Sequence, residues 1–124
     1  MARILVIADE PRIRDVLHAA LQQKGHEMAL AESGSSGVER FRQERPDVTI
    51  LDLHLPHLNG LAVLTEIRSI DPHAPVIILT GVGTETEEQQ ARVLGVSEVL
   101  RKGYSLHALG ETLTRVLNQP RPPA

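Results

Sequence analysis

The sequence predicts a single α/β domain in which five parallel strands form one sheet and five helices cover it. The chain has 124 residues, which suffices for one domain with a sizeable core and is too short for two. Five short apolar runs alternate with longer segments in which apolar residues recur at helical spacing. This alternation is typical of βαβ units built around a parallel sheet.

The expected strands are the five apolar runs, which are rich in the β-branched residues that strands favour. They cover residues 4–8, 28–31, 48–51, 76–79 and 96–100.

Three helices have clear limits and a clear apolar face. The first is expected from Pro11 to just before Gly25, since proline favours a helix start and glycine a helix end. The third should run from Asn59, as its N-cap, to Ile70, and the fifth should start at Ser105.

The second and fourth helices, expected at about 34–44 and 84–94, have weaker patterns. The fourth segment is almost entirely polar until Ala91, Val93 and Leu94. Because helices in proteins are held mainly by an apolar face, we expect the fourth helix to be loosely held.

Composition argues against several classes of function. Thirteen Lys and Arg against 16 Asp and Glu give a net charge of −3, so we expect no direct nucleic acid binding by this segment and no attraction to an anionic membrane. The absence of cysteine excludes disulfides and thiolate metal sites. No apolar run approaches the roughly 20 residues that span a bilayer, and no signal peptide is evident, so we expect a cytoplasmic protein.

Four chemically active side chains follow the predicted strands. Asp9, Asp52, Thr80 and Lys102 come at the ends of the first, third, fourth and fifth runs, and the carboxyl ends of parallel strands share one edge of a sheet. Two neighbouring carboxylates with oxygen ligands alone suit Mg²⁺. Asp52 could then attack phosphorus, while the hydroxyl and the ammonium bind the oxygens of the transferred group. The structural alternative is that these residues are helix caps and solvated surface groups.

The motifs "ILVIADEP", "DVTILDLHLPHLNGL", "PVIILTG" and "GVSEVLRKG" make the chain resemble the receiver domain of two-component response regulators. The resemblance extends from about Arg3 to Asn118. It implies a flavodoxin-like, doubly wound fold with strand order 2-1-3-4-5. The receiver domain would span residues 1–118, leaving residues 119–124 as a proline-rich tail or the start of a linker.

The resemblance also implies roles for particular residues. Asp52 would be the phosphoacceptor, with Thr80 as the switch hydroxyl and Lys102 as the phosphoryl-binding lysine. Asp9, Asp52 and the backbone carbonyl of His54 would bind Mg²⁺. The expected partners are a sensor histidine kinase or phosphotransfer protein and a downstream output domain or protein. The chain would not be an enzyme beyond its own phosphorylation and dephosphorylation.

Three residues depart from the family pattern. Ala8 stands where most receivers have an acid, so we expect weak Mg²⁺ binding. Gly103 replaces the usual proline after the lysine, and Val99 replaces a common aromatic residue. We therefore expect any signal to pass through the fourth helix and the Gly81–Val82–Gly83 segment without an aromatic gate.

Two other functions stay open. These departures would suit a receiver-like module that binds a protein partner independently of phosphorylation, although Asp52 and Lys102 argue against it. A phosphatase with Asp52 as covalent nucleophile is the third candidate, but phosphatases of the haloacid dehalogenase type need a second aspartate two residues on, where this chain has His54.

Overall fold

A computed structural model describes residues 2–53, 60–81, 85–101, 103 and 105–119. Within these residues the chain forms five strands and five helices in strict alternation. Their bounds are β1 Arg3–Ile7, α1 Pro11–Gln23, β2 Glu27–Ala31, α2 Gly34–Glu44, β3 Val48–Asp52, α3 Gly60–Ile70, β4 Val76–Thr80, α4 Glu85–Leu94, β5 Glu98–Arg101 and α5 Leu106–Asn118.

The five strands form one parallel sheet in the order β2-β1-β3-β4-β5, which confirms the predicted fold and topology. β3 lies between β1 and β4, with Ile7 opposite Leu51 and Asp52 opposite Leu79. Because all strands run the same way, their carboxyl ends meet at one edge of the sheet.

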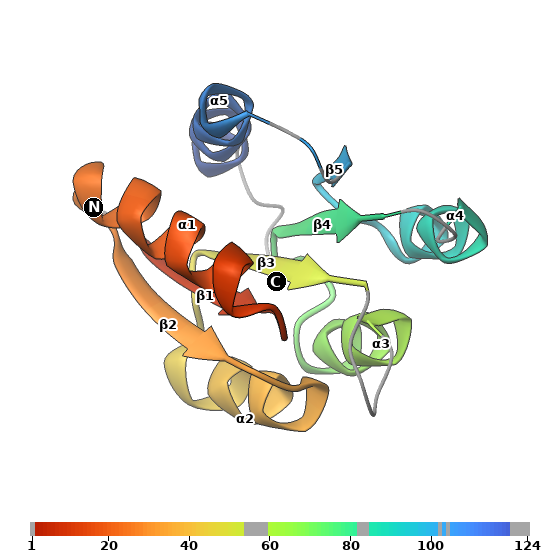
Figure 1. Ribbon diagram of the computed structural model, residues 1–124. Coiled ribbons are helices and arrows are strands. Elements are labelled where there is room, and N and C mark those ends of the chain that lie inside the picture. Colours follow the sequence, from red (N-terminus) through yellow and green to blue (C-terminus); the bar gives the residue numbers. More distant parts are fainter. Residues whose placement is uncertain (1, 54–59, 82–84, 102, 104, 120–124) are drawn as a thin grey trace.

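Both faces of the sheet are covered by helices, as Figure 1 shows. α1 and α5 cover one face of the sheet, and α2, α3 and α4 cover the other (Figure 1). Each strand contributes to both layers of the core, because its alternate residues point to opposite faces. The α1 and α5 side buries Ile4, Val6, Ala8, Leu17, Leu21, Val48, Ile50, Ile77, Leu79, Leu109, Leu113 and Val116. The opposite side buries Leu5, Ile7, Phe41, Leu51, Leu53, Val63, Leu64, Ile67, Val76, Ile78 and Ala91.

Local signals set several helix limits as expected. α1 has Pro11 at its start, and Gly25 after it adopts a φ of 80°, a conformation that costs glycine little. Ser105 caps α5 by accepting a hydrogen bond from the Ala108 N–H. The predicted N-cap of α3, Asn59, lies outside the described residues.

α4 has few apolar contacts, as its sequence predicts, but it also has polar ones. Ala91 and Glu88 are its buried residues. The Glu88 carboxylate lies 3.6 Å from a guanidinium nitrogen of Arg101 in β5. Arg68 of α3 donates hydrogen bonds to the carbonyls of Leu94 and Gly95. The helix is therefore tied to both of its neighbours in the fold.

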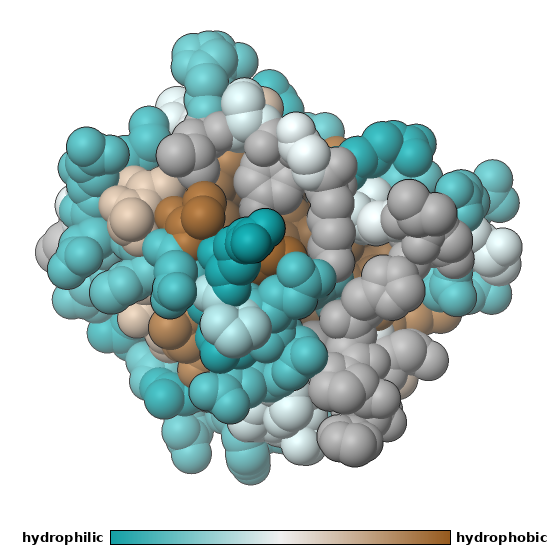
Figure 2. Space-filling model, viewed as in Figure 1, coloured by the Kyte–Doolittle hydropathy of each residue, from teal (hydrophilic) through white to brown (hydrophobic). Residues whose placement is uncertain are grey.

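Hydrophilic residues dominate the surface seen in Figure 2, and apolar residues show there only in small areas between them. None of the helices among the described residues is both long and apolar enough to cross a membrane. The predicted tail falls largely outside the described residues, so the domain limits 1–118 and 119–124 stay predictions.

Candidate functional site

Asp52 is the last residue of β3, the central strand of the sheet. Every residue of β3 is buried, and Asp52 itself is 0% exposed. The pairing with β4 continues beyond it, because the Leu53 N–H donates to the Leu79 carbonyl at 3.1 Å. The backbone that carries this carboxylate is thus held by β4, and β1 pairs with β3 up to the preceding residue, Leu51.

Gly60 supports the same segment from the start of α3. Its N–H donates to the Leu53 carbonyl at 3.1 Å. A Cβ atom on Gly60 would lie 2.5 Å from the Leu53 Cα and 2.8 Å from the Asp52 carbonyl oxygen. Only glycine allows this approach of two backbones. The sequence pattern predicted Gly60 as the first residue of the third helix but not this close contact, although a glycine opening an apolar helix could have signalled it.

The turn between β1 and α1 carries Asp9. Its Ala8 N–H donates to the Ala31 carbonyl at 3.1 Å, so pairing with β2 extends past β1. Arg14 of α1 donates to the carbonyls of Ala8 and Asp9 at 3.0 and 2.8 Å. The Asp9 residue is exposed at the edge of the sheet.

Ala8 lies beside Asp52. Ile7 pairs with Leu51, and extending this register by one residue sets Ala8 against Asp52. Both residues are 0% exposed, and in-register neighbours on adjacent strands point to the same face about 5 Å apart. The methyl group therefore occupies the position next to the candidate nucleophile.

Thr80 is the last residue of β4 and is 3% exposed. It pairs with Arg101, the last residue of β5. The structure thus brings Asp9, Asp52 and Thr80 to one edge of the sheet, as predicted. Lys102 and His54 lie outside the described residues, so their predicted roles stay predictions.

The donor chemistry of this edge fits a small oxygen-ligated cation. Among the residues that the structure describes, no group of three or more His, Asp or Glu side chains could hold a metal ion. The described acids of the site are the two carboxylates of Asp9 and Asp52, and Mg²⁺ is typically held by one or two carboxylates plus waters. The expectation of weak Mg²⁺ binding, which comes from Ala8, stays a prediction.

Burial of Asp52 limits how the site can react. A side chain with no exposed surface cannot be reached by a phosphodonor from solvent. In the arrangement that the structure describes, Asp52 has no surface open to solvent.

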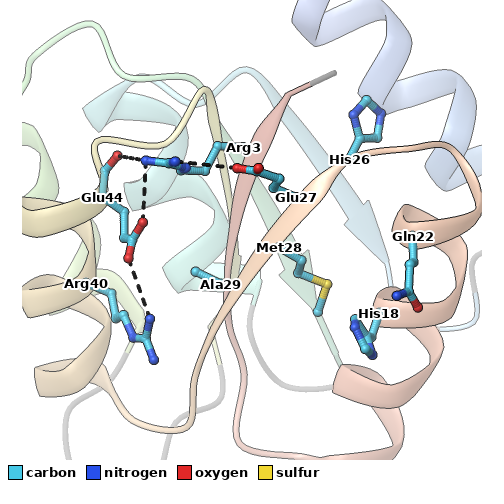
Figure 3. Close-up of a pocket in the computed structure, with 9 residues that line it drawn as sticks. All are labelled: Arg3, His18, Gln22, His26, Glu27, Met28, Ala29, Arg40 and Glu44. Atoms are coloured by element: carbon cyan, nitrogen blue, oxygen red, sulfur yellow. Dashed lines mark hydrogen bonds and ion pairs between the residues drawn. The ribbon is translucent and has the colours of Figure 1, made fainter.

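A pocket of about 410 Å³ lies at a different place, over the edge strand β2 and between α1 and α2 (Figure 3). Ion pairs run across it from Glu27 through Arg3 and Glu44 to Arg40. Arg3 and Glu27 are the first residues of β1 and β2, so this pocket belongs to the amino ends of the strands. It lies opposite the edge that carries Asp52, and its charges are already paired.

Acids and a hydroxyl thus lie at the carboxyl edge of a doubly wound parallel sheet, which is where open α/β domains bind their ligands. The model of the response regulator receiver domain family matches residues 4–114. The chain therefore belongs to the response regulator receiver family of two-component systems, which confirms the resemblance. Receiver domains serve in signalling rather than as dedicated enzymes, and they generally bind Mg²⁺ for phosphorylation.

The relatives include a protein of matching length and longer regulators. Protein PilH of Pseudomonas aeruginosa is 36% identical over 94% of this chain and 98% of PilH. The probable transcriptional regulatory protein TcrX of Mycobacterium tuberculosis is 32% identical over 94% of this chain, which spans only 50% of TcrX.

Solved structures give the same result. A response regulator receiver domain protein from Clostridium thermocellum superposes with a TM-score of 0.90 at 36% identity, covering 95% of both chains. A CheY-like receiver domain protein from Methanospirillum hungatei reaches 0.91 at 22% identity, covering 95% of this chain and 94% of its own. At that identity the likeness concerns the fold alone.

Proposed function

We propose that this chain accepts a phosphoryl group from a histidine kinase onto Asp52 in a Mg²⁺-dependent reaction, and thereby switches its interaction with a partner or a fused output domain. The observation that carries this proposal is the position of Asp52. The acid ends a fully buried central strand at the edge where Asp9 and Thr80 also lie.

The residues divide the proposed chemistry among them. A carboxylate oxygen of Asp52 forms a bond to phosphorus as the bond between phosphorus and the donor's histidine nitrogen breaks. Thr80 donates its hydroxyl hydrogen to an oxygen of the transferred group, and Lys102 contributes an ammonium to the same group. Asp9 and Asp52, with the His54 carbonyl, would hold Mg²⁺, which when bound offsets the negative charge of the phosphoryl group.

Intact-mass measurement tests the proposal directly. The protein is incubated with a small phosphodonor and Mg²⁺, beside an Asp52→Asn variant that keeps the side-chain shape. We expect one phosphate adduct on the unaltered protein and none on the variant. An adduct of equal yield on Asp52→Asn would assign the acceptor to another residue.

The second candidate function is a module that binds a protein partner independently of phosphorylation. Two observations favour it: Asp52 is fully buried, and a methyl group rather than an acid lies beside it. The same experiment decides between the two functions. A folded protein that takes no adduct even at high Mg²⁺ supports the constitutive binding module.

A further inference from the structure

The turn that carries Asp9 is held by a side chain outside the set that the family resemblance names. Arg14, in the first turn of α1, aims one guanidinium nitrogen, Nη1, at two successive carbonyls. The distances are 3.0 Å to the Ala8 oxygen and 2.8 Å to the Asp9 oxygen. Consecutive carbonyls normally point in different directions along an extended chain. Their convergence on one donor therefore fixes how the chain turns at Asp9.

Arg14 is itself well anchored. Its side chain is 16% exposed, whereas that of Glu32, whose carboxylate lies 3.9 Å from Nη2, is 77% exposed. Its backbone N–H donates to the Glu10 carbonyl at 3.2 Å. The guanidinium and the backbone of one residue thus hold all three carbonyls of the turn 8–10.

Asp9 depends on this support because Ala8 supplies no carboxylate. A site with few acids gains affinity mainly from how well its remaining ligands are pre-oriented. The direction of the Asp9 side chain follows from the backbone conformation at Asp9, which the two hydrogen bonds from Arg14 define.

We propose that Arg14 is a positioning residue that holds the turn 8–10 so that the Asp9 carboxylate is oriented for Mg²⁺. This inference rests on the proposed function of the Asp9 and Asp52 site. It makes a prediction opposite to that from charge alone. A guanidinium close to a cation site repels the cation. If this repulsion determines the Mg²⁺ affinity, removing the guanidinium tightens binding. If positioning of Asp9 determines it, removing the guanidinium weakens binding.

The test is a Mg²⁺ titration of the full chain, followed by backbone amide NMR shifts, so that the readout is metal binding rather than phosphorylation. Arg14→Met removes the donor and the charge but keeps an unbranched side chain. We expect its dissociation constant for Mg²⁺ to rise about 10-fold, the low end of the effect of losing a group that orients a metal ligand. The amide shifts of residues 8–10 should also change in the metal-free protein.

Two further variants separate positioning from charge. Arg14→Lys keeps the charge but has a shorter side chain, so we expect affinity between those of the unaltered protein and Arg14→Met. Arg12→Met removes a charge from an exposed position of the same helix and should change affinity less than about twofold, since exposed charges are well screened. If Arg14→Met does not fold, Arg14→Lys decides, because charge alone predicts that it equals the unaltered protein.

The outcomes also separate this inference from the proposed function. Unchanged or tighter Mg²⁺ binding by Arg14→Met, or Arg14→Lys indistinguishable from the unaltered protein, would overturn the role of Arg14 and leave phosphorylation of Asp52 intact. Failure of the unaltered protein to bind Mg²⁺ at all would instead overturn the metal site, and the positioning role with it.

Discussion

At the scale of single residues, the pair of Ala8 and Asp52 has the clearest chemical consequence. Both residues are fully buried at the carboxyl edge of β1 and β3, with a methyl group where a third carboxylate would strengthen a cation site. An alanine there removes repulsion between like charges and also removes a partner for the metal's waters. Stability without metal and affinity for metal are therefore expected to change in opposite directions.

We predict that Ala8→Asp tightens Mg²⁺ binding and destabilises the metal-free protein. A group that holds the metal through water typically contributes about 10- to 100-fold in affinity, or roughly 1.4 to 2.7 kcal/mol. Without metal, the new carboxylate faces Asp52 across adjacent strands and lowers the melting temperature. Melting curves and NMR titrations at increasing Mg²⁺ measure both effects.

The matched comparison is Ala8→Asn, which has nearly the same shape without the charge. It should show the steric cost of a larger side chain and little of the gain in affinity. If Ala8→Asp and the unaltered protein bind Mg²⁺ equally, the missing acid is not what limits affinity.

Gly60 gives the second prediction at this scale. Gly60→Ala would force a methyl group to within 2.5 Å of the Leu53 Cα, and backbone atoms of a central strand cannot move aside cheaply. We expect a loss of roughly 1–3 kcal/mol in the free energy of unfolding, as for other overpacked sites. Denaturant unfolding measures this loss.

Gly110→Ala in α5 is the control for Gly60→Ala. Its new methyl group would meet only the flexible end of Lys24, with the nearest atom, Nζ, at 2.9 Å. Alanine in a helix interior gains roughly 0.5–1 kcal/mol over glycine, so this change should be neutral or stabilising. Equal losses at both positions would mean that the contact between Gly60 and β3 is unimportant.

At the scale of elements, α4 is the helix whose attachment depends most on polar groups. Glu88 is 8% exposed, and its carboxylate lies 3.6 Å from Arg101 and 4.0 Å from Arg92. Arg101 in turn lies opposite Thr80 in the register of the parallel strands β4 and β5. A change at Thr80 therefore has a route to α4 through the end of β5.

We predict that a phosphoryl analogue at Asp52 perturbs α4 more than the middle of β5. Val99 is a partly buried aliphatic residue. It has no aromatic ring that could follow the Thr80 hydroxyl. Amide NMR shifts should be largest in α4, residues 85–94, and at Arg101, and small at Val99. The predicted Val82 and Gly83 part of the hinge lies outside the described residues and is tested by the same spectra.

Asp52→Asn provides the baseline for this experiment, since it should show none of the changes. Glu88→Gln should weaken the link between α4 and Arg101 and reduce the shifts in the helix. Maximal shifts at Val99, with residues 85–94 unmoved, would contradict the proposed route.

At the scale of the whole molecule, His26 connects the start of the chain to the loop before β2. Its Nδ1 accepts a hydrogen bond from the Ala2 N–H at 3.1 Å, which requires that nitrogen to be unprotonated. Burial, the positive amino terminus and Lys24 lower the pKa of His26 below its ordinary value of 6.5. The folded protein therefore binds a proton at His26 less readily than the unfolded chain does.

We predict that the free energy of unfolding decreases as the pH falls below the ordinary pKa of His26, about 6.5. With the folded pKa below the unfolded one, the contribution of His26 is complete above about pH 6.5 and decreases as the pH falls toward the folded pKa. Urea unfolding between pH 7.5 and 5.5 measures the slope. His26→Asn keeps an acceptor that does not titrate, so its slope should be shallower. Identical slopes in both proteins would exclude His26 as the source.

Sequence patterns alone were sufficient for much of the fold and for the position of three candidate side chains at one edge of the sheet. Strand and helix periods are local properties, and buried parallel strands appear as uninterrupted apolar runs such as 48–51 and 76–79. Parallel strands also end at one edge, so the sequence alone assigns Asp9, Asp52 and Thr80 to that edge. The fifth strand was less well predicted: residues 96–100 were expected and Glu98–Arg101 is observed, because strand ends depend on hydrogen-bond partners in the neighbouring strand.

The tertiary structure alone decided which residues support that site. The hydrogen bonds from Arg14 to two carbonyls, the backbone contact of Gly60 and the burial of Glu88 each join segments whose approach is set by packing. Periodicity classifies a glutamate in a polar helix as solvated, and only the position of α4 against β5 makes Glu88 a buried partner of Arg101. Local spacing can specify which side chains lie at one edge of the sheet, but the orientation of each group there depends on contacts between residues distant in sequence.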